Sequence, residues 1–221
     1  MSKFLKILPL IFLTVSLLLF VSCKKEKESI KVTGTVIDST QNAPLSGVEV
    51  ELSAQVITSG TFSGSFTKLE TASTDGSGNF SMEHETVKAA AYKLKFSKTG
   101  YFTKETTISA DVIQNNDPYD NTYYAYPEAW IKIHIKNANP VNSMDYMYYK
   151  FLSGAYSCTG CCNTLLNKFY GTDVDSIQIC KTRGGMEVEI QWNVQRGTSS
   201  TQYSEKIFCS PFDTTLFDLF Y

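Results

Sequence analysis

The sequence predicts an all-β fold made of two consecutive β-sandwich domains. Apolar residues alternate with polar ones along several stretches, which is the pattern of strands with one buried and one solvent-facing side. Clusters of Gly, Asn, Asp and Pro separate these stretches and indicate turns. The clearest alternation places the following residues on shared faces: Val48, Val50 and Leu52; Tyr92, Leu94 and Phe96; Ile131, Ile133 and Ile135; Met186, Val188, Ile190, Trp192 and Val194.

The first 22 residues have the layout of a secretory signal peptide. Lys3 and Lys6 precede an uncharged apolar run of about 15 residues, and the small residue Ser22 follows it. This run is shorter than the roughly 20 residues that a membrane-spanning helix needs. The stretch "LFVSC", which ends at Cys23, resembles the lipobox of bacterial lipoproteins. The resemblance implies that Cys23 is lipidated and becomes the mature N-terminus; an ordinary cleaved signal with a chance cysteine is the alternative.

A charged tether, residues 23–29, follows the signal. Its sequence "CKKEKES" is dominated by charges and is expected to stay solvated. Several acyl chains on Cys23, palmitate among them, would hold the protein stably on a membrane. The tether's position resembles the charged sorting signal of Bacteroidetes lipoproteins. We therefore expect a lipid-anchored outer-membrane protein, facing either the cell surface or the periplasm.

Residues 30–112 are predicted to form the first sandwich. Pro44 and Gly47 mark the entry to one strand, "TDGSGNF" supplies a tight reversal, and Gly100 precedes an aromatic residue at a turn. The ordered blocks "KVTGTVIDSTQNAPLSGVEVEL", "TASTDGSGNFSM" and "YKLKFSKTGYFTKETTI" resemble the carboxypeptidase regulatory-like domain, a sandwich of the transthyretin-like type. The resemblance implies no catalytic residue here. The insertion 54–70 departs from the family pattern and is expected to form a decorated loop or a long hairpin.

The densest cluster of turn residues predicts a linker at 113–128, and residues 129–221 are predicted to form the second sandwich, which contains cysteines. A short helix is predicted at 163–170, with Asn163 as its cap and Gly171 at its end. The strands of this domain are expected near 129–136, 145–152, 175–181, 186–195, 203–209 and 215–221.

The inventory of reactive residues argues against several enzyme classes. The only histidines are His84 and His134, so the paired-histidine spacing of zinc hydrolases is absent. No phosphate loop, dinucleotide fingerprint or Gly-x-Ser-x-Gly elbow occurs either. A cysteine nucleophile paired with His134 is a weak alternative, because His134 alternates with isoleucines and is expected to face solvent. We predict a protein that is not an enzyme, with no catalytic residue, metal or cofactor.

Charge and aromatic content bear on possible partners. The 20 basic and 22 acidic residues give no basic excess, so no nucleic-acid partner is expected. The aromatic stretches "YDNTYYAYPEAW" and "MDYMYYKF" raise the possibility of a flat platform for a glycan or a protein partner. Its expected members are Tyr119, Tyr123, Tyr126 and Trp130. The competing interpretation is that these rings serve strand and interdomain packing.

Five cysteines remain once Cys23 is assigned to the lipid: Cys158, Cys161, Cys162, Cys180 and Cys209. Export favours disulfides over a metal or redox site, although both alternatives stay open. Adjacent Cys161 and Cys162 are not expected to join each other. We expect one or two bridges from the "CTGCC" cluster to Cys180 and Cys209, with at least one cysteine left over.

Together these features predict a lipid-anchored envelope protein that acts as a non-catalytic binding or scaffold module for a glycan or a protein. The first alternative is a purely structural or assembly lipoprotein of the outer membrane with no soluble ligand. An uncharacterised hydrolase is the third.

Overall fold

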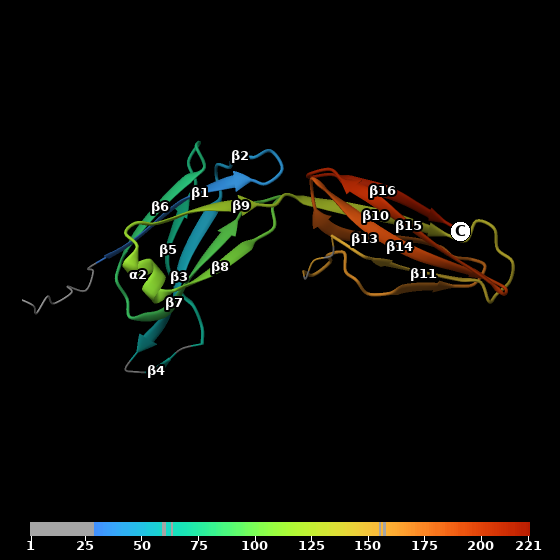
Figure 1. Cartoon of the computed structure of the whole chain (residues 1–221), viewed down its shortest axis with the longest axis horizontal. Helices are drawn as coiled ribbons and strands as arrows, with labels where there is room; N and C mark the ends of the chain where they lie inside the picture. Colours follow the sequence, from blue (N-terminus) through green and yellow to red (C-terminus); the bar gives the residue numbers. More distant parts are fainter. Residues whose placement is uncertain (1–28, 59–60, 63, 155, 157) are drawn as a thin grey trace, which may run out of the picture.

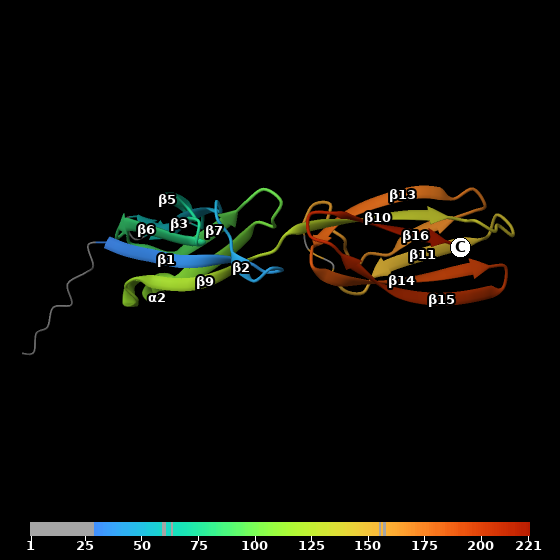
Figure 2. The ribbon, with the colours of Figure 1, turned by 90° about the horizontal axis from the view of Figure 1, so that it is seen from above.

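The computed structural model describes residues 29–58, 61–62, 64–154, 156 and 158–221. Two β-sandwiches follow one another along the chain and lie end to end in space (Figure 1). Seen from above, each consists of two layers of strands (Figure 2). The predicted fold class is therefore confirmed. The predicted signal peptide, the tether up to residue 28 and Cys23 lie outside the described residues.

One sheet of the first sandwich is built around its first strand. The central strand β1 pairs antiparallel with β6 and β2 and parallel with β9, with Val32 opposite Tyr119 in the parallel register. The strands are β1 (Ser29–Asp38), β2 (Ala43–Pro44), β6 (Asn79–Glu85) and β9 (Tyr119–Ala125). The reversal before β6 forms as predicted: the Asp75 carboxylate accepts hydrogen bonds from the amides of Ser77 and Asn79. Gly78 has φ +76° there, and a Cβ would lie 2.6 Å from the Val36 carbonyl oxygen.

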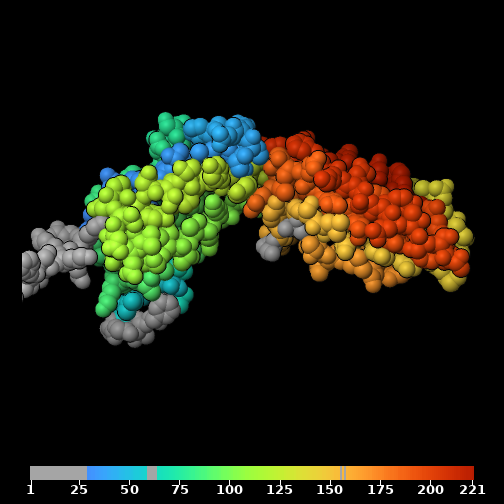
Figure 3. Space-filling view, viewed as in Figure 1, coloured from blue at the N-terminus to red at the C-terminus, as the bar shows by residue number. Residues whose placement is uncertain are grey.

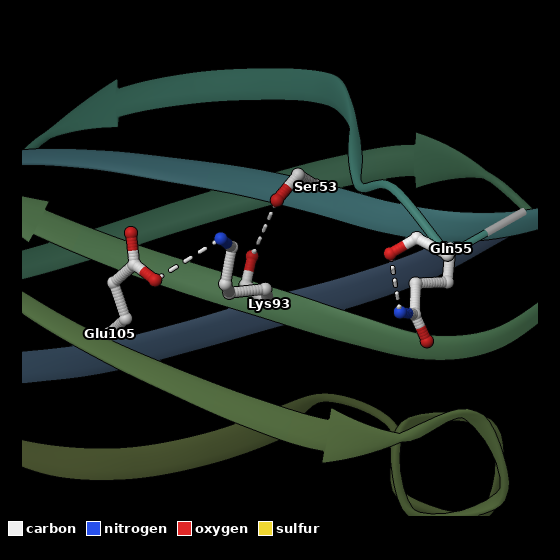
Figure 4. Close-up of polar contacts among 5 residues, drawn as sticks. Ser53, Gln55, Lys93 and Glu105 are labelled. Carbon is white, nitrogen blue, oxygen red and sulfur yellow. Dashed lines mark hydrogen bonds and ion pairs between the residues drawn. The ribbon is translucent and has the colours of Figure 1, made fainter.

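The other sheet of the first sandwich is antiparallel, in the order β5-β3-β7-β8, and β4 pairs with the C-terminal end of β3. Its strands are β3 (Glu49–Thr58), β4 (Thr61–Phe62), β5 (Thr67–Ser73), β7 (Ala89–Ser97) and β8 (Lys104–Ser109). The insertion thus lengthens β3 and adds a short hairpin with β4. Cross-strand polar contacts tie this sheet together: Ser53 donates to the Lys93 carbonyl, and Lys93 lies 3.1 Å from Glu105 (Figure 4). Gln55 donates to the Gly64 carbonyl at 3.3 Å in the same region.

The predicted linker 113–128 is wrong, because most of it belongs to the first sandwich. Helix α2 (Ala110–Asn115) places Ile113 in the core, and β9 then completes the sheet beside β1. Only residues 116–118 separate these two elements. The cluster of Asn, Asp and Pro marks this tight connection, and the alternation of Tyr119, Tyr123 and Ala125 that follows it is a strand. The first sandwich therefore extends to Ala125.

The second sandwich packs a three-stranded sheet, β13-β10-β16, on a four-stranded one, β12-β11-β14-β15. Its strands are β10 (Glu128–Lys136), β11 (Tyr146–Phe151), β12 (Asn167–Tyr170), β13 (Asp175–Arg183), β14 (Met186–Arg196), β15 (Ser199–Cys209) and β16 (Thr214–Phe220). As in the first sandwich, the first strand pairs parallel with the last, here β10 with β16. The six strands predicted for this domain are all present.

The helix predicted at 163–170 is wrong. Residues 167–170 form β12, with Met147 opposite Phe169 in an antiparallel register, and the Asn163 side chain accepts a hydrogen bond from the Leu165 amide in a local turn. The Phe169 ring lies parallel to that of Tyr149 at 6.2 Å and packs against the core. Pairing with β11 and this ring packing override the short helical pattern.

Each sandwich has its own hydrophobic core. The alternating residues predicted to share faces are buried as expected: Val48, Val50, Leu52, Tyr92, Leu94 and Phe96 in the first, and Ile131, Ile133, Ile135, Val188 and Ile190 in the second. The two bodies meet near residues 38–44, where the surface of the first sandwich touches that of the second (Figure 3). A Cβ on Gly185 would lie 2.5 Å from the Thr40 methyl group there, so the Thr40 side chain packs closely on the Gly185 backbone.

Candidate functional site

The four residues predicted to form a binding platform do not lie on one exposed surface. Tyr123 is only 6% exposed, and its ring lies 4.4 Å from that of Phe96 in the first core. Burial raises the pKa of the Tyr123 hydroxyl accordingly. Tyr119 is half-buried against the same core, and Tyr126 and Trp130 lie at the junction between the sandwiches. The platform at these residues is a wrong prediction, and the packing interpretation describes Tyr123.

Tyr126 and Trp130 instead contact two cations of β13. The Arg183 guanidinium lies 3.9 Å from the centre of the Tyr126 ring and 4.5 Å from that of Tyr156. Lys181 forms a 2.6 Å ion pair with Glu128 and lies 5.9 Å from the centre of the Trp130 ring. The contact that reaches the first sandwich is made by Phe102, whose ring centre lies 5.9 Å from the Lys181 ammonium and 5.8 Å from the centre of the Tyr156 ring.

A second contact across the junction centres on Asp38. The Tyr101 hydroxyl donates to the Asp38 carboxylate at 2.7 Å, and the Tyr101 ring meets the edge of Phe212 from the second sandwich at 5.2 Å. Burial acts to raise the pKa of Asp38, but hydrogen bonds from Thr40, Tyr101 and Gln41 outweigh it and lower the pKa overall. Burial and the neighbouring carboxylate raise the pKa of Tyr101. This pair is therefore a fixed structural contact at neutral pH.

Aromatic rings do gather on the outer face of the sheet β12-β11-β14-β15, where Tyr146 and Tyr148 are half-buried and Tyr170 is exposed. Tyr146 and Tyr148 alternate on β11 with buried Met147, so both rings point away from the core. Tyr170 on β12 lies directly opposite Tyr146 in the register and is 64% exposed. The Tyr146 ring is stacked 6.4 Å from Tyr148 and lies 5.7 Å from Tyr170. These three residues form what we call the tyrosine face.

Amide and hydroxyl side chains continue the tyrosine face across β14 and β15. In the strand register Tyr146 lies opposite Gln195, and Tyr148 lies opposite Asn193. The Asn193 oxygen accepts a hydrogen bond from Ser200, which leaves its NH₂ group free to donate, and the Gln195 NH₂ donates to the Gly197 carbonyl, which leaves its oxygen free to accept. The residues that continue the surface are Gln191, Asn193 and Gln195 on β14 and Ser200, Gln202 and Ser204 on β15. The face thus offers aromatic rings next to both donors and acceptors.

Part of the sequence signal for this face was recognisable. The stretch "MDYMYYKF" contains Tyr146 and Tyr148, and their alternation with Met147 could have assigned both rings to one outer face. Tyr170 could not be found in this way, because the helix predicted at 163–170 includes it. The amide groups were not predicted, because the alternation in β14 was used only to assign its buried face.

Comparison with known protein families identifies the chain. The model of the HIUase/transthyretin family matches residues 32–147, which is 116 of the 221 residues. The chain belongs to the HIUase/transthyretin family. The match covers the first sandwich from β1 to β9 and continues into the start of β11, so it includes Tyr146 of the tyrosine face. No match is found among curated proteins.

Solved structures similar to this family member include two pilins and a protein of Bacillus anthracis. The Bacillus anthracis TIE protein matches with a TM-score of 0.37 and 12% identity over 87% of this chain. The shaft pilin SpaA from Lactobacillus rhamnosus GG matches at 0.31 and 11% identity, covering 87% of this chain and 96% of the pilin. A streptococcal ancillary pilin matches at 0.32 and 15% identity, covering 89% of this chain and 63% of that one. This chain spans about a third of the length of the TIE protein, 33%.

The cysteines of this family member form two disulfides. Cys162 is joined to Cys180 on β13, and Cys158 is joined to Cys161 within the cluster. Backbone hydrogen bonds from Cys162 to Lys181 and from Lys181 to Gly160 hold the cluster against β13. Cys162 and Cys180 thus pair as one of the expected bridges, whereas the bridge from Cys158 to Cys161 was not foreseen.

The expected bridge to Cys209 is absent, and this part of the prediction is wrong. Cys209 is a buried free thiol whose Sγ donates to the Ile207 carbonyl. It lies on β15, in the sheet opposite the one that carries Cys180, and the "CTGCC" cluster is held next to β13. Burial raises the pKa of the Cys209 thiol to about 11, which disfavours the reactive thiolate.

The two histidines and the described acids do not gather into a metal-binding cluster. Within the described ranges no three His, Cys, Asp or Glu side chains are placed to hold a metal ion together. His134 lies on the outer face of β10, as expected from its alternation with buried isoleucines, and there its Nε2 lies 2.7 Å from the Asp175 carboxylate and its ring contacts Phe220. In the part of the chain that the structure describes, no helix has the length and apolarity to span a membrane.

Proposed function

We propose that this chain is a lipid-anchored envelope protein whose second sandwich binds carbohydrate without catalysing a reaction on it. The observation that carries the proposal is the tyrosine face: three neighbouring rings on a flat outer sheet surface, continued by amide and hydroxyl groups. The first sandwich then connects this binding body to the anchor and holds it through the junction contacts of Phe102 with Lys181 and of Tyr101 with Phe212.

The chemistry of the face suits a sugar better than a purely apolar ligand. A pyranose ring has a C–H face that packs on an aromatic ring and a rim of hydroxyls that both donate and accept hydrogen bonds. Tyr146, Tyr148 and Tyr170 supply the rings, and Asn193 and Gln195 lie one strand away to reach the rim. A strip of tyrosines and amides about four strands wide spans about 14 Å between its outer strands, room for two to three sugar units.

Two lysines suggest the charge of the preferred glycan. Lys168 lies directly opposite Tyr148 in the register, and Lys150 follows Tyr148 on the same face of β11. Neither lysine forms a salt bridge with another residue in the described part of the chain. A glycan that carries carboxylate groups would neutralise both charges, so we place acidic polysaccharides first among the candidates.

The location is a separate part of the proposal and is supported by the sequence. The lipobox-like "LFVSC" and the charged tether favour a Bacteroidetes-type lipoprotein anchored in the outer membrane through Cys23. The blocks of the first sandwich favour the carboxypeptidase regulatory-like type within the transthyretin-like folds. An anchored binding module would retain a polysaccharide at the membrane, and no nucleic-acid partner is proposed.

The test is binding of the purified protein to an array of neutral and acidic glycans, followed by titration of the best ligand. Tyr148→Ala should weaken binding about 30-fold, because truncating a central aromatic anchor costs about 2 kcal/mol. Tyr124→Ala is the matched control, since Tyr124 is 43% exposed on β9 of the other sandwich and should leave binding unchanged. Equal effects of the two substitutions, or no glycan bound by the wild-type chain, would reject the proposal in favour of a structural or assembly role.

A further inference from the structure

The opposite sheet of the second sandwich, β13-β10-β16, carries large apolar side chains on its outer surface. Alternation places polar residues on such a surface when solvent covers it. Here the side chains are Ile177 and Ile179 on β13, with 53% and 61% exposure, and Leu216 and Phe220 on β16, with 70% and 50%. We call this group the apolar face. It lies on the layer away from the tyrosine face (Figure 2).

The register of the three strands brings these side chains together around β10. Lys132 lies between Ile179 and Leu216, and His134 lies between Ile177 and Asp218. The four apolar side chains therefore flank the central strand on both sides, with Lys132 and His134 between the two pairs. A surface of clustered, exposed apolar side chains within a folded domain is typical of an interaction site.

The charges on the apolar face are only partly compensated within the chain. The Asp175 carboxylate contacts the Lys136 ammonium at 3.0 Å and the His134 Nε2 at 2.7 Å. Lys132 forms no salt bridge with any residue that the structure describes, and Asp218 approaches only His134, at 3.8 Å. Lys132 and Asp218 thus lie on adjacent strands and in adjacent rows of the same face, and neither has a close ion-pair partner of its own among the described residues.

We propose that the apolar face is the contact between two copies of this chain. In this dimer the apolar faces of the two copies lie against each other. The twofold axis lies in the plane between them and passes midway between Lys132 and Asp218, so it places each of these residues opposite the other residue of the second copy. Each Lys132 then meets the Asp218 of the other copy, and one operation makes two identical ion pairs. The isoleucines, Leu216 and Phe220 of both copies pack around these pairs and exclude water from them.

This arrangement explains both features of the surface at once. A partner that is purely apolar would bury Lys132 with no opposite charge beside it and Asp218 with only His134 at 3.8 Å, which is costly. A second copy supplies the opposite charge for each residue without any further assumption about a partner. The tyrosine faces stay on the outside of such a dimer, so the dimer would offer two glycan-binding surfaces at once.

The test uses residues 29–221, which contain every described strand of both sandwiches, in sedimentation equilibrium up to about 1 mM protein. A contact with a Kd weaker than about 1 mM would not qualify as a specific dimer. We expect a monomer–dimer equilibrium that Leu216→Asp abolishes. A wild-type chain that stays monomeric throughout this range would overturn the proposal.

Charge reversal makes the test specific for the predicted pairing. Lys132→Glu and Asp218→Lys should each weaken the homodimer at least tenfold, because like charges then face each other in both pairs. Mixing these two variants should restore dimerisation, since each pair again joins opposite charges. The double variant in one chain should restore it too. No restoration in either arrangement, in variants that keep the wild-type circular dichroism, would reject this contact even if the protein dimerises elsewhere.

Discussion

The two sandwiches share a plan but differ in what they expose. In both, the first strand pairs parallel with the last, and both have a core of alternating apolar side chains. Among the described residues, fifteen large apolar side chains are exposed. The first sandwich contributes only Val112 and Tyr124, and the other thirteen belong to the second: Val141, Met144, Leu152, Leu165, Leu166, Tyr170, Ile177, Ile179, Tyr203, Phe208, Phe212, Leu216 and Phe220.

This difference indicates a division of labour between the sandwiches. A body with few exposed apolar side chains is suited to act as a support, whereas exposed apolar and aromatic surfaces mark interaction sites. The tyrosine face and the apolar face both lie on the second sandwich. Its disulfides also belong to it alone, because the first sandwich contains no cysteine. We expect the first sandwich to fold independently and the second to carry the interactions.

The largest effect is expected from removing β9 from the first sandwich. A fragment of residues 29–112 should not fold, because it loses seven residues of pairing with β1 and the Tyr123 ring that packs on Phe80 and Phe96. A fragment of residues 29–126 should fold. Amide dispersion in NMR spectra distinguishes the two outcomes.

This pair of fragments also tests the comparison itself. If the longer fragment is unfolded, the first sandwich depends on the second, and the idea of an independent support is wrong. If the shorter fragment folds as well as the longer one, β9 is dispensable, and the predicted linker at 113–128 would have been nearer to the truth.

The sequence reveals strands more readily than their partners. Alternation identified β10, β11 and β13 to β16 because it depends only on neighbouring residues, each of which is either buried or exposed. The parallel pairing of Trp130 with Thr214 joins residues far apart in the chain, and no local pattern records it. The same limit applies to the site. Tyr146 and Tyr148 stand out in the sequence, but the contribution of Tyr170 depends on the pairing of β12 with β11.

A moderate effect is expected from the disulfides, and it should be confined to the second sandwich. Replacing Cys162 and Cys180 together by alanine should lower its free energy of unfolding by about 3 kcal/mol, because the bridge closes a loop with a separation of 18 residues. Both tryptophans, Trp130 and Trp192, lie in this sandwich, so denaturant titration followed by tryptophan fluorescence reports on it selectively.

The second bridge provides the control. Replacing Cys158 and Cys161 by alanine opens a loop with a separation of only 3 residues and should cost about 2 kcal/mol or less on the same loop-entropy argument. A larger loss from this pair than from Cys162 and Cys180 would contradict the loop-entropy argument. The fragment 29–126 contains no cysteine, so neither pair of replacements can change its unfolding. A change in the unfolding of the first sandwich within the whole chain would therefore reveal coupling through the junction.

The smallest effect is expected from the Asp38 contact, and it should appear as a pH dependence of the first sandwich. The Asp38 carboxylate accepts hydrogen bonds from the Thr40 amide and hydroxyl, the Gln41 amide and the Tyr101 hydroxyl, at 2.7 to 3.1 Å. These bonds lower the pKa of Asp38 in the folded state below its usual value of about 3.9. The unfolded chain therefore binds the proton more tightly, and the stabilisation is present above about pH 4 and is lost as the pH falls through the folded pKa.

Asp38→Asn keeps the size of the side chain and removes its charge. The variant should lose about 1 to 2 kcal/mol of unfolding free energy at neutral pH, because hydrogen bonds to a charged group are stronger than those to an amide. The variant should also lack the decrease in unfolding free energy that protonation of Asp38 causes in the wild type at acidic pH. Denaturant titrations of the fragment 29–126 at about pH 7 and about pH 3, followed by circular dichroism, measure both quantities on the first sandwich alone. If wild type and variant lose the same stability between these pH values, the Asp38 contact does not control the acid response, and other carboxylates of this sandwich do.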